Sequence, residues 1–273
     1  MNAQITSNDL QKKIWGYLET LALETDEARK SEEMQRYLDF GARFHQYSPS
    51  NIFLIMLSKP DATMVAGFQA WKKMGRYVMK GEKGIPIFAP MIYKEDPNDE
   101  NSKVLHGFRV VYVFDISQTD GDPLPPVPDW KSPEKSVELT EKLIRFAESK
   151  GITVIYKELP GETQGVSRRG AIEISPDAGT KTLIHELAHE LLHQRTDIFL
   201  DREIREMEAE CVGYVVAKYF GIDGLNSPNY ITLNGIASEM IQKNKDRMHH
   251  IASEIIQRIE DMSESQDYAT NFT

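Results

Sequence analysis

The chain has little of what an exported or membrane protein needs. Cys211 is the one cysteine among 273 residues, so no internal disulfide can form, as is usual in a reducing cytoplasm. No apolar run approaches the roughly 18 residues of a membrane span. Residues 1–6 show neither the basic nor the apolar region of an export signal. We therefore expect a cytoplasmic protein without a membrane partner.

Positive charge is also scarce overall, but it is concentrated in one segment. The net charge is −10, yet residues 41–94 carry eight Lys and Arg against two Asp and Glu. Aromatic residues are interleaved with these cations, a combination typical of single-stranded nucleic-acid binding, in which cations contact phosphates and rings stack on bases. The alternative is that Phe68 and Trp71, three residues apart on a predicted helix, belong to the core. The candidate DNA-binding residues are Arg43, Trp71, Lys72, Lys73, Arg76, Lys80 and Lys83.

The most specific pattern is His-Glu-x-x-His at residues 185–189. It lies in a segment with helical periodicity that contains no Pro or Gly. On a helix the imidazoles of His185 and His189 are offset by only about 40° and share one face. Two such imidazoles suit a zinc site, and Glu186 between them is close enough to act as a base. The pattern predicts a metal site for Zn²⁺, with Mn²⁺ or another divalent ion as the alternative.

A third protein ligand is expected from the next helical segment, residues 202–220. Glu206 and Glu210 are four residues apart there and share a face, although such an acidic cluster can also be a solvated helix start. We expect Glu206 to bind the metal and Glu210 to hold a ligand imidazole through its other nitrogen. His193 is a candidate for the same supporting role or for a packing role. The reserve ligands are Glu203 and Glu208.

Such a site is suited to amide hydrolysis by a zinc-dependent metallopeptidase. The metal would polarise a peptide carbonyl, while Glu186 takes a proton from the attacking water and passes it to the leaving amine. The alternating residues 171–175 predict a strand. It could hold an extended peptide by main-chain pairing, or it could be an ordinary core strand.

The order of predicted elements indicates an α+β protein of two domains. The predicted helices are 8–46, 50–57, 68–74, 132–150, 182–195, 202–220 and 231–262, and the predicted strands are 85–90, 108–114, 152–158 and 171–175, with a loop over 160–170. Four prolines between residues 121 and 128 indicate a semi-rigid linker. We place an N-terminal domain at residues 1–118, the linker at 119–131 and a second domain at 132–273.

The first half of the chain resembles a known domain. Residues 47–51 (Tyr-Ser-Pro-Ser-Asn), 60–68 and 75–87 resemble the N-terminal domain of ArdC-type antirestriction proteins, which are encoded on plasmids and other mobile elements. In that family the domain is associated with single-stranded DNA binding, and a metallopeptidase-like domain follows it. The resemblance implies that residues 1–118 form a mixed helix and strand domain that binds single-stranded DNA.

The second half resembles the zincin domain of ImmA/IrrE-type peptidases, through residues 185–189 and the Glu-Met-Glu-Ala-Glu stretch at 206–210. The resemblance implies a zincin-like fold with Glu206 as third ligand. It also implies a catalytic role for Tyr230, which lies in a Tyr-Ile element after the metal helices. Relatives often carry Asn or Asp at the position of Glu210, and the longer side chain here could reach the metal itself.

Three functions are consistent with these patterns. The first is an antirestriction-type protein that binds single-stranded DNA and carries a metal-dependent peptidase-like site. The second is a regulatory metallopeptidase that cleaves a repressor, with an N-terminal domain that recognises a protein. The third is a DNA-binding protein with a non-catalytic metal site. Binding of oligonucleotides, and its loss with salt, separates the first function from the second.

Overall fold

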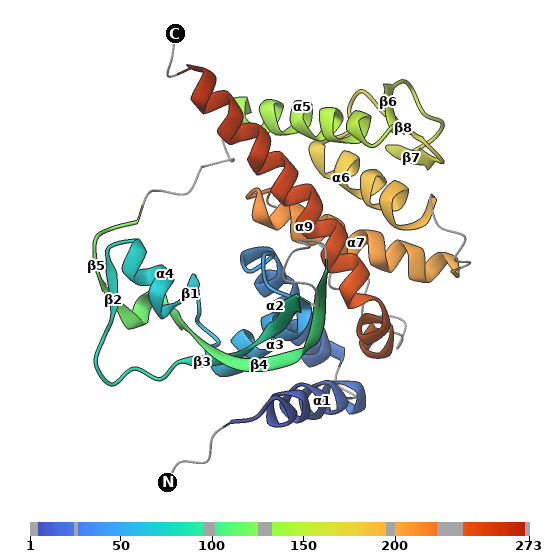
Figure 1. Ribbon diagram of the computed structural model, residues 1–273. Coiled ribbons are helices and arrows are strands. Elements are labelled where there is room, and N and C mark those ends of the chain that lie inside the picture. Colours follow the sequence, from blue (N-terminus) through green and yellow to red (C-terminus); the bar gives the residue numbers. More distant parts are fainter. Residues whose placement is uncertain are drawn as a thin grey trace. The chain divides into compact units, whose positions relative to one another are not determined.

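The computed structural model describes residues 5–24, 27–94, 102–124, 133–194, 200–222 and 237–270, and it divides into two compact units (Figure 1). Unit 1 comprises Met1–Glu24 and Tyr47–Pro126, and unit 2 comprises Thr25–Gln46 and Val127–Thr273. Both units contain helices and sheets, which confirms the α+β class. Among the described helices, none combines the length and apolarity that crossing a bilayer requires.

Unit 1 is built from helices and a small antiparallel sheet. Its described elements are α1 (Ser7–Leu23), α3 (Pro49–Ser58), β1 (Val65–Gly67), α4 (Phe68–Lys73), β2 (Arg76–Val78), β3 (Ile85–Lys94), β4 (Lys103–Asp115), a 3₁₀ turn (Ile116–Gln118) and β5 (Thr119–Gly121). The sheet has the order β1-β4-β3, and β2 pairs separately with β5. The single helix predicted over residues 8–46 is wrong, because the structure has two helices there, α1 and α2 (Glu27–Arg43), and α2 belongs to unit 2. The other predicted helices and the long strands of unit 1 are present, while β1, β2 and β5 are too short for a periodic signal.

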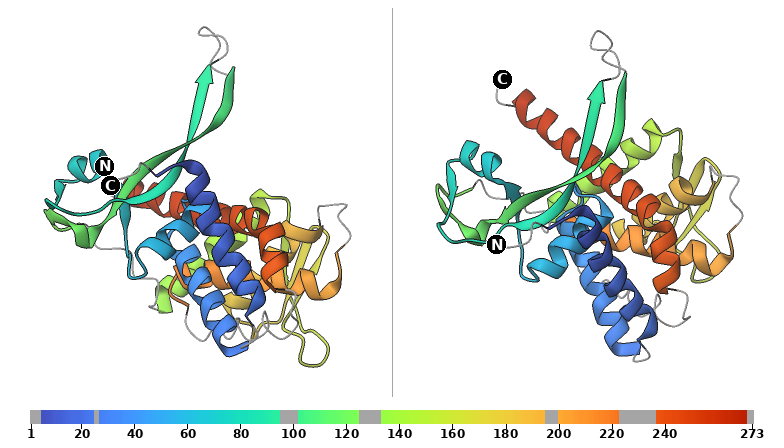
Figure 2. Two further views of the ribbon diagram at one scale, coloured as in Figure 1. Left: turned by 90° about the horizontal axis from the view of Figure 1, so that it is seen from below. Right: turned by 60° about the horizontal axis from the view of Figure 1, so that its bottom comes forward.

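The strands β3 and β4 form a two-stranded ribbon (Figure 2), and the side chains on its two faces differ in burial. Ile85 pairs with Val113, and both are buried in the core. Helix α3 packs against β3, where the Asn51 amide donates to the Phe88 carbonyl at 3.0 Å and accepts from its N–H at 2.8 Å. Strand residues alternate between faces, so Phe108 and Tyr112 lie on the opposite face and are 49% and 45% exposed. The sheet therefore presents aromatic rings to solvent.

Unit 2 places helices around a second small sheet. Its described elements are α2 (Glu27–Arg43), α5 (Pro133–Ser149), β6 (Thr153–Tyr156), β7 (Gly165–Arg168), β8 (Ala171–Ile174), α6 (Thr180–His189), a π-helical turn (Glu190–Gln194), α7 (Arg202–Tyr219) and α9 (Ala237–Thr270). Helices α6, α7 and α9 form a packed layer, in which α9 contacts both α7 and α5 (Figure 1). The predicted helix over residues 182–195 thus ends in a π turn.

Helix α2 belongs to unit 2, although its residues lie far ahead of the other elements of that unit. Tyr214 on α7 donates to Asp39 at 2.7 Å, and its hydroxyl also accepts from Gln35. Tyr37, Leu38 and Phe40 are buried beside these contacts. The division of the chain therefore differs from the boundaries expected at residues 118 and 132. It differs again at β5, which pairs with β2 within unit 1.

The sheet of unit 2 has the order β6-β8-β7. The central strand β8 runs parallel to β6 and antiparallel to β7. The prediction that residues 171–175 hold a peptide by main-chain pairing is wrong, because both edges of β8 are already paired. The predicted loop at 160–170 is also wrong in part, since residues 165–168 form the edge strand β7.

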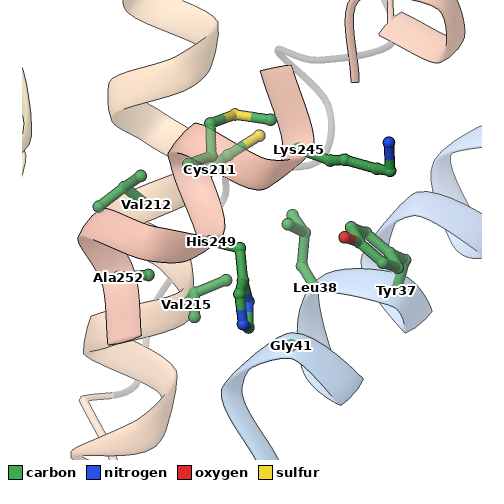
Figure 3. Close-up of a pocket in the computed structure, with 10 residues that line it drawn as sticks. Tyr37, Leu38, Gly41, Cys211, Val212, Val215, Lys245, His249 and Ala252 are labelled. Atoms are coloured by element: carbon green, nitrogen blue, oxygen red, sulfur yellow. The ribbon is translucent and has the colours of Figure 1, made fainter. Parts of the chain in front are cut away.

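A small apolar cavity lies between α2, α7 and α9, lined by side chains that include Leu38, Val215 and Ala252 (Figure 3). Its volume of about 30 Å³ is room for one water molecule. Gly41 lines it from the interior of α2, and a Cβ there would lie 3.6 Å from a Val215 methyl group, which is an ordinary contact.

Replacing Gly41 with alanine is expected to stabilise the protein by about 0.5–1 kcal/mol, because alanine loses less conformational entropy in a helix. The free energy of unfolding from urea titration measures the change. Gly81→Ala is the matched control: Gly81 has a φ of +97°, a conformation that alanine adopts only with strain. A stability of Gly41→Ala below that of the parent would contradict the observed packing.

Candidate metal centre

Helices α6 and α7 bring the predicted ligands together. The apolar stripe of α6, formed by Leu183, Ile184, Leu187 and Ala188, is buried, so this helix is fixed in rotation. His185 and His189 consequently project beside α7. The chain reaches α7 through a short connection, and α7 presents Glu206 to both imidazoles. Packing of one helix on the other therefore completes a three-residue donor set.

The distances within this set suit a divalent cation. His185 Nε2 lies 3.1 Å from His189 Nε2, and Glu206 Oε2 lies 3.7 Å from the first and 3.4 Å from the second. Around a tetrahedral zinc ion with bonds near 2.0–2.1 Å, ligand atoms lie about 3.3 Å apart. Among the described residues, this is the group of His, Cys, Asp and Glu side chains that could hold a metal ion.

The charged groups of the site determine how a cation would compete with protons. The two imidazoles, His185 first and then His189, hold the pKa of the Glu206 carboxyl well below its usual range. Burial alone would lower the pKa of His185, but hydrogen bonds to Glu206 and Glu210 outweigh it and raise the pKa to about 9. A cation bound here must therefore displace a proton at neutral pH.

The structure places the two glutamates of α7 on different nitrogens of His185. Glu206 faces Nε2, whereas Glu210 Oε2 lies 3.1 Å from Nδ1. This arrangement supports Glu206 as the ligand and Glu210 as the group that orients the ring. The reserve ligand Glu203 is exposed at the first turn of α7.

Glu186 lies between α6 and the edge strand β7. Burial raises the pKa of its carboxyl, an effect that the nearby His185 and His189 partly offset, and the Ser167 backbone also bonds to it. A Cβ at Gly165 would lie 2.7 Å from Glu186 Cγ and 2.7 Å from Thr182 Cγ2, closer than side chains tolerate. Glycine at 165 therefore lets β7 approach Glu186. A raised pKa improves a carboxylate as a proton acceptor.

His193 stands behind His189 on the π turn. The Nδ1 atoms of the two rings are 3.2 Å apart, and His193 Nε2 lies 2.9 Å from Glu208 Oε2. Glu208 is fully buried, and it also accepts from the Arg247 guanidinium of α9. Burial tends to raise the pKa of Glu208, but His193 and Arg247 outweigh it and lower the pKa. The carboxylate of Glu208, a predicted reserve ligand, therefore bonds to His193 and Arg247 and lies outside the three-residue donor set.

The candidate DNA-binding residues are dispersed. Trp71 is 0% exposed, and its indole N–H donates to the Phe114 carbonyl at 2.8 Å, so it is a core residue and has no free face for a base. Arg76 donates to Thr119, Gly121 and Asp122, which ties β2 to β5. Arg43 belongs to unit 2. Arg43 is exposed too, and the exposed members within unit 1 are Lys72, Lys73, Lys80 and Lys83.

Sequence reasoning missed several residues of the site. Gly165 lies against Glu186, and Arg247 bonds to Glu208. Neither belongs to a recognisable sequence pattern: Gly165 reads as a loop glycine, and Arg247 as a basic residue on an amphipathic helix. The exposed aromatic pair on β4 was detectable as alternation in residues 108–114. Tyr230, predicted as catalytic, lies outside the described residues.

Comparison with known proteins identifies the class of the N-terminal part. Residues 8–114 match the family model described as the N-terminal domain of anti-restriction factor ArdC. This part of the chain therefore carries an ArdC N-terminal domain, as its motifs predict. An uncharacterized protein of Bacillus anthracis is 30% identical over 283 aligned positions, which cover 84% of this chain and 48% of the relative. The chain thus spans about half the length of this curated relative.

Two crystal structures of the antirestriction protein ArdC from plasmid R388 are similar in fold over much of the chain. The metal-free structure is 18% identical with a TM-score of 0.46, and covers 78% of this chain and 83% of that one. The Mn(II)-bound structure is 17% identical with a TM-score of 0.49, and covers 79% and 84%.

Proposed function

We propose that this chain is an antirestriction-type protein that combines a metal-dependent, peptidase-like hydrolytic site in unit 2 with single-stranded DNA binding by unit 1. The observation that supports the hydrolytic site is the convergence of His185 Nε2, His189 Nε2 and Glu206 Oε2 on one point, with the buried carboxylate of Glu186 beside it. A zincin-like role for unit 2 rests on this geometry together with the His-Glu-x-x-His pattern.

His185, His189 and Glu206 would hold the ion, Zn²⁺ or Mn²⁺, and the ion would supply Lewis acidity toward a peptide carbonyl and toward water. Glu186 would accept a proton from the attacking water and later return it to the leaving amine. Strand β7 has one edge paired to β8, and no other described strand pairs with its second edge. Glu186 lies against β7, where its carboxylate bonds to the Ser167 backbone. An extended peptide that added to this edge would lie next to the base.

Element analysis of purified protein tests the metal site first. The parent should bind about one equivalent of a divalent ion, and His189→Ala should bind little, because one of three protein ligands is lost. Added metal should also stabilise the parent against unfolding, by about 2.7 kcal/mol at a hundredfold excess over Kd. His250→Ala, which removes an exposed imidazole of α9, is the control. Equal metal content in parent and His189→Ala would refute the site.

Single-stranded DNA binding is supported by the solvent-facing side of the β3-β4 ribbon. Phe108 and Tyr112 are exposed there, and the Phe108 ring lies 6.1 Å from that of Phe88. The turn that carries Lys83 runs beside Tyr112, because a Cβ at Gly84 would lie 2.8 Å from Tyr112 Cβ. Exposed rings next to a cation suit bases and phosphates of an unpaired strand. This surface replaces Trp71 as the stacking platform.

The double variant Phe108→Ala, Tyr112→Ala is expected to weaken oligonucleotide binding by about 1–3 kcal/mol for each lost stack. Lys83→Ala should reduce the slope of log affinity against log salt concentration by about 1, the contribution of one phosphate contact. Trp15→Ala is the control, since Trp15 is an exposed ring on α1. Fluorescence anisotropy with a labelled oligonucleotide measures all three. Absence of binding by the parent at low salt would favour a unit 1 that recognises a protein.

A further inference from the structure

A hydrogen-bonded chain links the metal site to the C-terminal helix. It runs from His189 to His193, then to Glu208 on α7, and ends at Arg247 on α9. His193 and Glu208 have side-chain exposures of 2% and 0%. Each link therefore lies inside unit 2, where hydrogen bonds are strong and an unmade bond is costly.

The protons in this chain have one consistent arrangement when His189 binds a cation. Its Nε2 faces His185 and Glu206, so a ligand lone pair must be there, and the proton of the neutral ring sits on Nδ1. That N–H then donates to His193 Nδ1, 3.2 Å away. His193 must carry its own proton on Nε2, which donates to the Glu208 carboxylate.

Arg247 completes the arrangement by charge. A fully buried carboxylate is unfavourable unless it is paired, and the guanidinium of Arg247 contacts both oxygens of Glu208. Glu208 can thus remain an acceptor for His193. Because Arg247 comes from α9, the pairing exists only when α9 is docked on α7.

We propose that His193, Glu208 and Arg247 are positioning residues that fix the tautomer and orientation of His189, and that metal binding is thereby coupled to the docking of α9. This inference rests on the proposed metal site. It adds a contribution from a helix that supplies no ligand, and it predicts that changes at residue 247 alter metal affinity.

The test measures the affinity of the full chain for Zn²⁺ and for Mn²⁺ by competition with a chelating dye. Arg247→Met keeps the length of the side chain and removes its charge, and we expect it to weaken metal binding by about 10–100-fold. Arg247→Lys restores the charge and should recover most of the affinity. Arg258→Met removes an exposed cation of the same helix and should match the parent.

A second variant guards against misfolding. Glu208→Gln combined with Arg247→Met leaves no unpaired buried charge, and it should show the same loss of affinity because His193 no longer has an anionic acceptor. Amide hydrogen exchange gives an independent readout: added metal should slow exchange in α9 of the parent, and do so less in Arg247→Met.

The outcomes separate the two proposals. If the parent binds metal, and Arg247→Met and the double variant bind it within twofold of the parent, the positioning role of His193, Glu208 and Arg247 is refuted and the metal site stands. If Arg247 is merely structural, Arg247→Met will lower stability equally with and without metal and leave the metal affinity unchanged, and this result also refutes the positioning role. If the parent binds neither Zn²⁺ nor Mn²⁺, the proposed metal site is refuted, and the positioning role that rests on it is refuted too.

Discussion

Glu186→Gln is expected to retain the metal and to lower peptide hydrolysis by at least about a hundredfold, the usual contribution of a general base. The amide of glutamine matches the size of the carboxylate but cannot accept a proton at neutral pH. The three donor atoms come from other residues, so the cation should still be held. Cleavage of a mixed peptide library by metal-loaded protein, followed by mass spectrometry, measures the loss.

The matched control for this variant is Glu203→Gln, which neutralises an exposed acid at the start of α7. It should cleave like the parent, and chelator-treated parent should be inactive. Hydrolysis by Glu186→Gln at the rate of the parent would remove this residue as the base. A parent that takes up metal and cleaves nothing would favour a non-catalytic metal site.

Trp71→Ala is expected to destabilise the protein by about 3–5 kcal/mol, the usual cost of truncating a large core aromatic. The ring is fully buried, and its loss would also leave the Phe114 carbonyl without the indole donor. Phe68→Ala, three residues earlier on the same helix, removes a ring that is 51% exposed and should change stability by less than about 0.5 kcal/mol.

Urea unfolding followed by circular dichroism compares these two variants with the parent. Trp71→Ala should unfold at a lower urea concentration than the parent, and any loss of oligonucleotide binding should follow from unfolding. The opposite pattern, with Trp71→Ala as stable as the parent and selectively defective in DNA binding, would overturn the core placement. Trp71 would then be a surface residue, as one interpretation of the sequence had it.

The sequence could predict which side chains meet at the candidate metal centre, because helical periodicity determines which side chains share a face. His185 and His189 are four residues apart, and so are Glu206 and Glu210. Spacing alone cannot decide between the two glutamates, because the choice depends on how α7 packs against α6. In the structure that packing directs Glu206 to both Nε2 atoms and Glu210 to Nδ1 of His185.

Other parts of the site depend on contacts between distant segments, for which one sequence carries no local signal. Arg247 reaches Glu208 from another helix, and Gly165 is special only because Glu186 and Thr182 lie against it. The predicted α+β class and most long elements are present. The strands β1, β2 and β5 were missed, since three residues are too few for an alternation pattern. Strand β7 was missed because Val166 is the one large apolar residue in Gly165–Arg168.

Residues 25–46 belong to unit 2, although the segments on either side of them belong to unit 1, and this affects both truncation and synthesis of the protein. A fragment that begins at residue 132 would lack α2, and the side of α7 that Tyr37 and Leu38 help to cover would meet water. During synthesis α2 emerges long before α7 and α9, so its apolar face stays without these partners until they have been synthesised. Unit 2 can therefore be completed only after α9 has been synthesised.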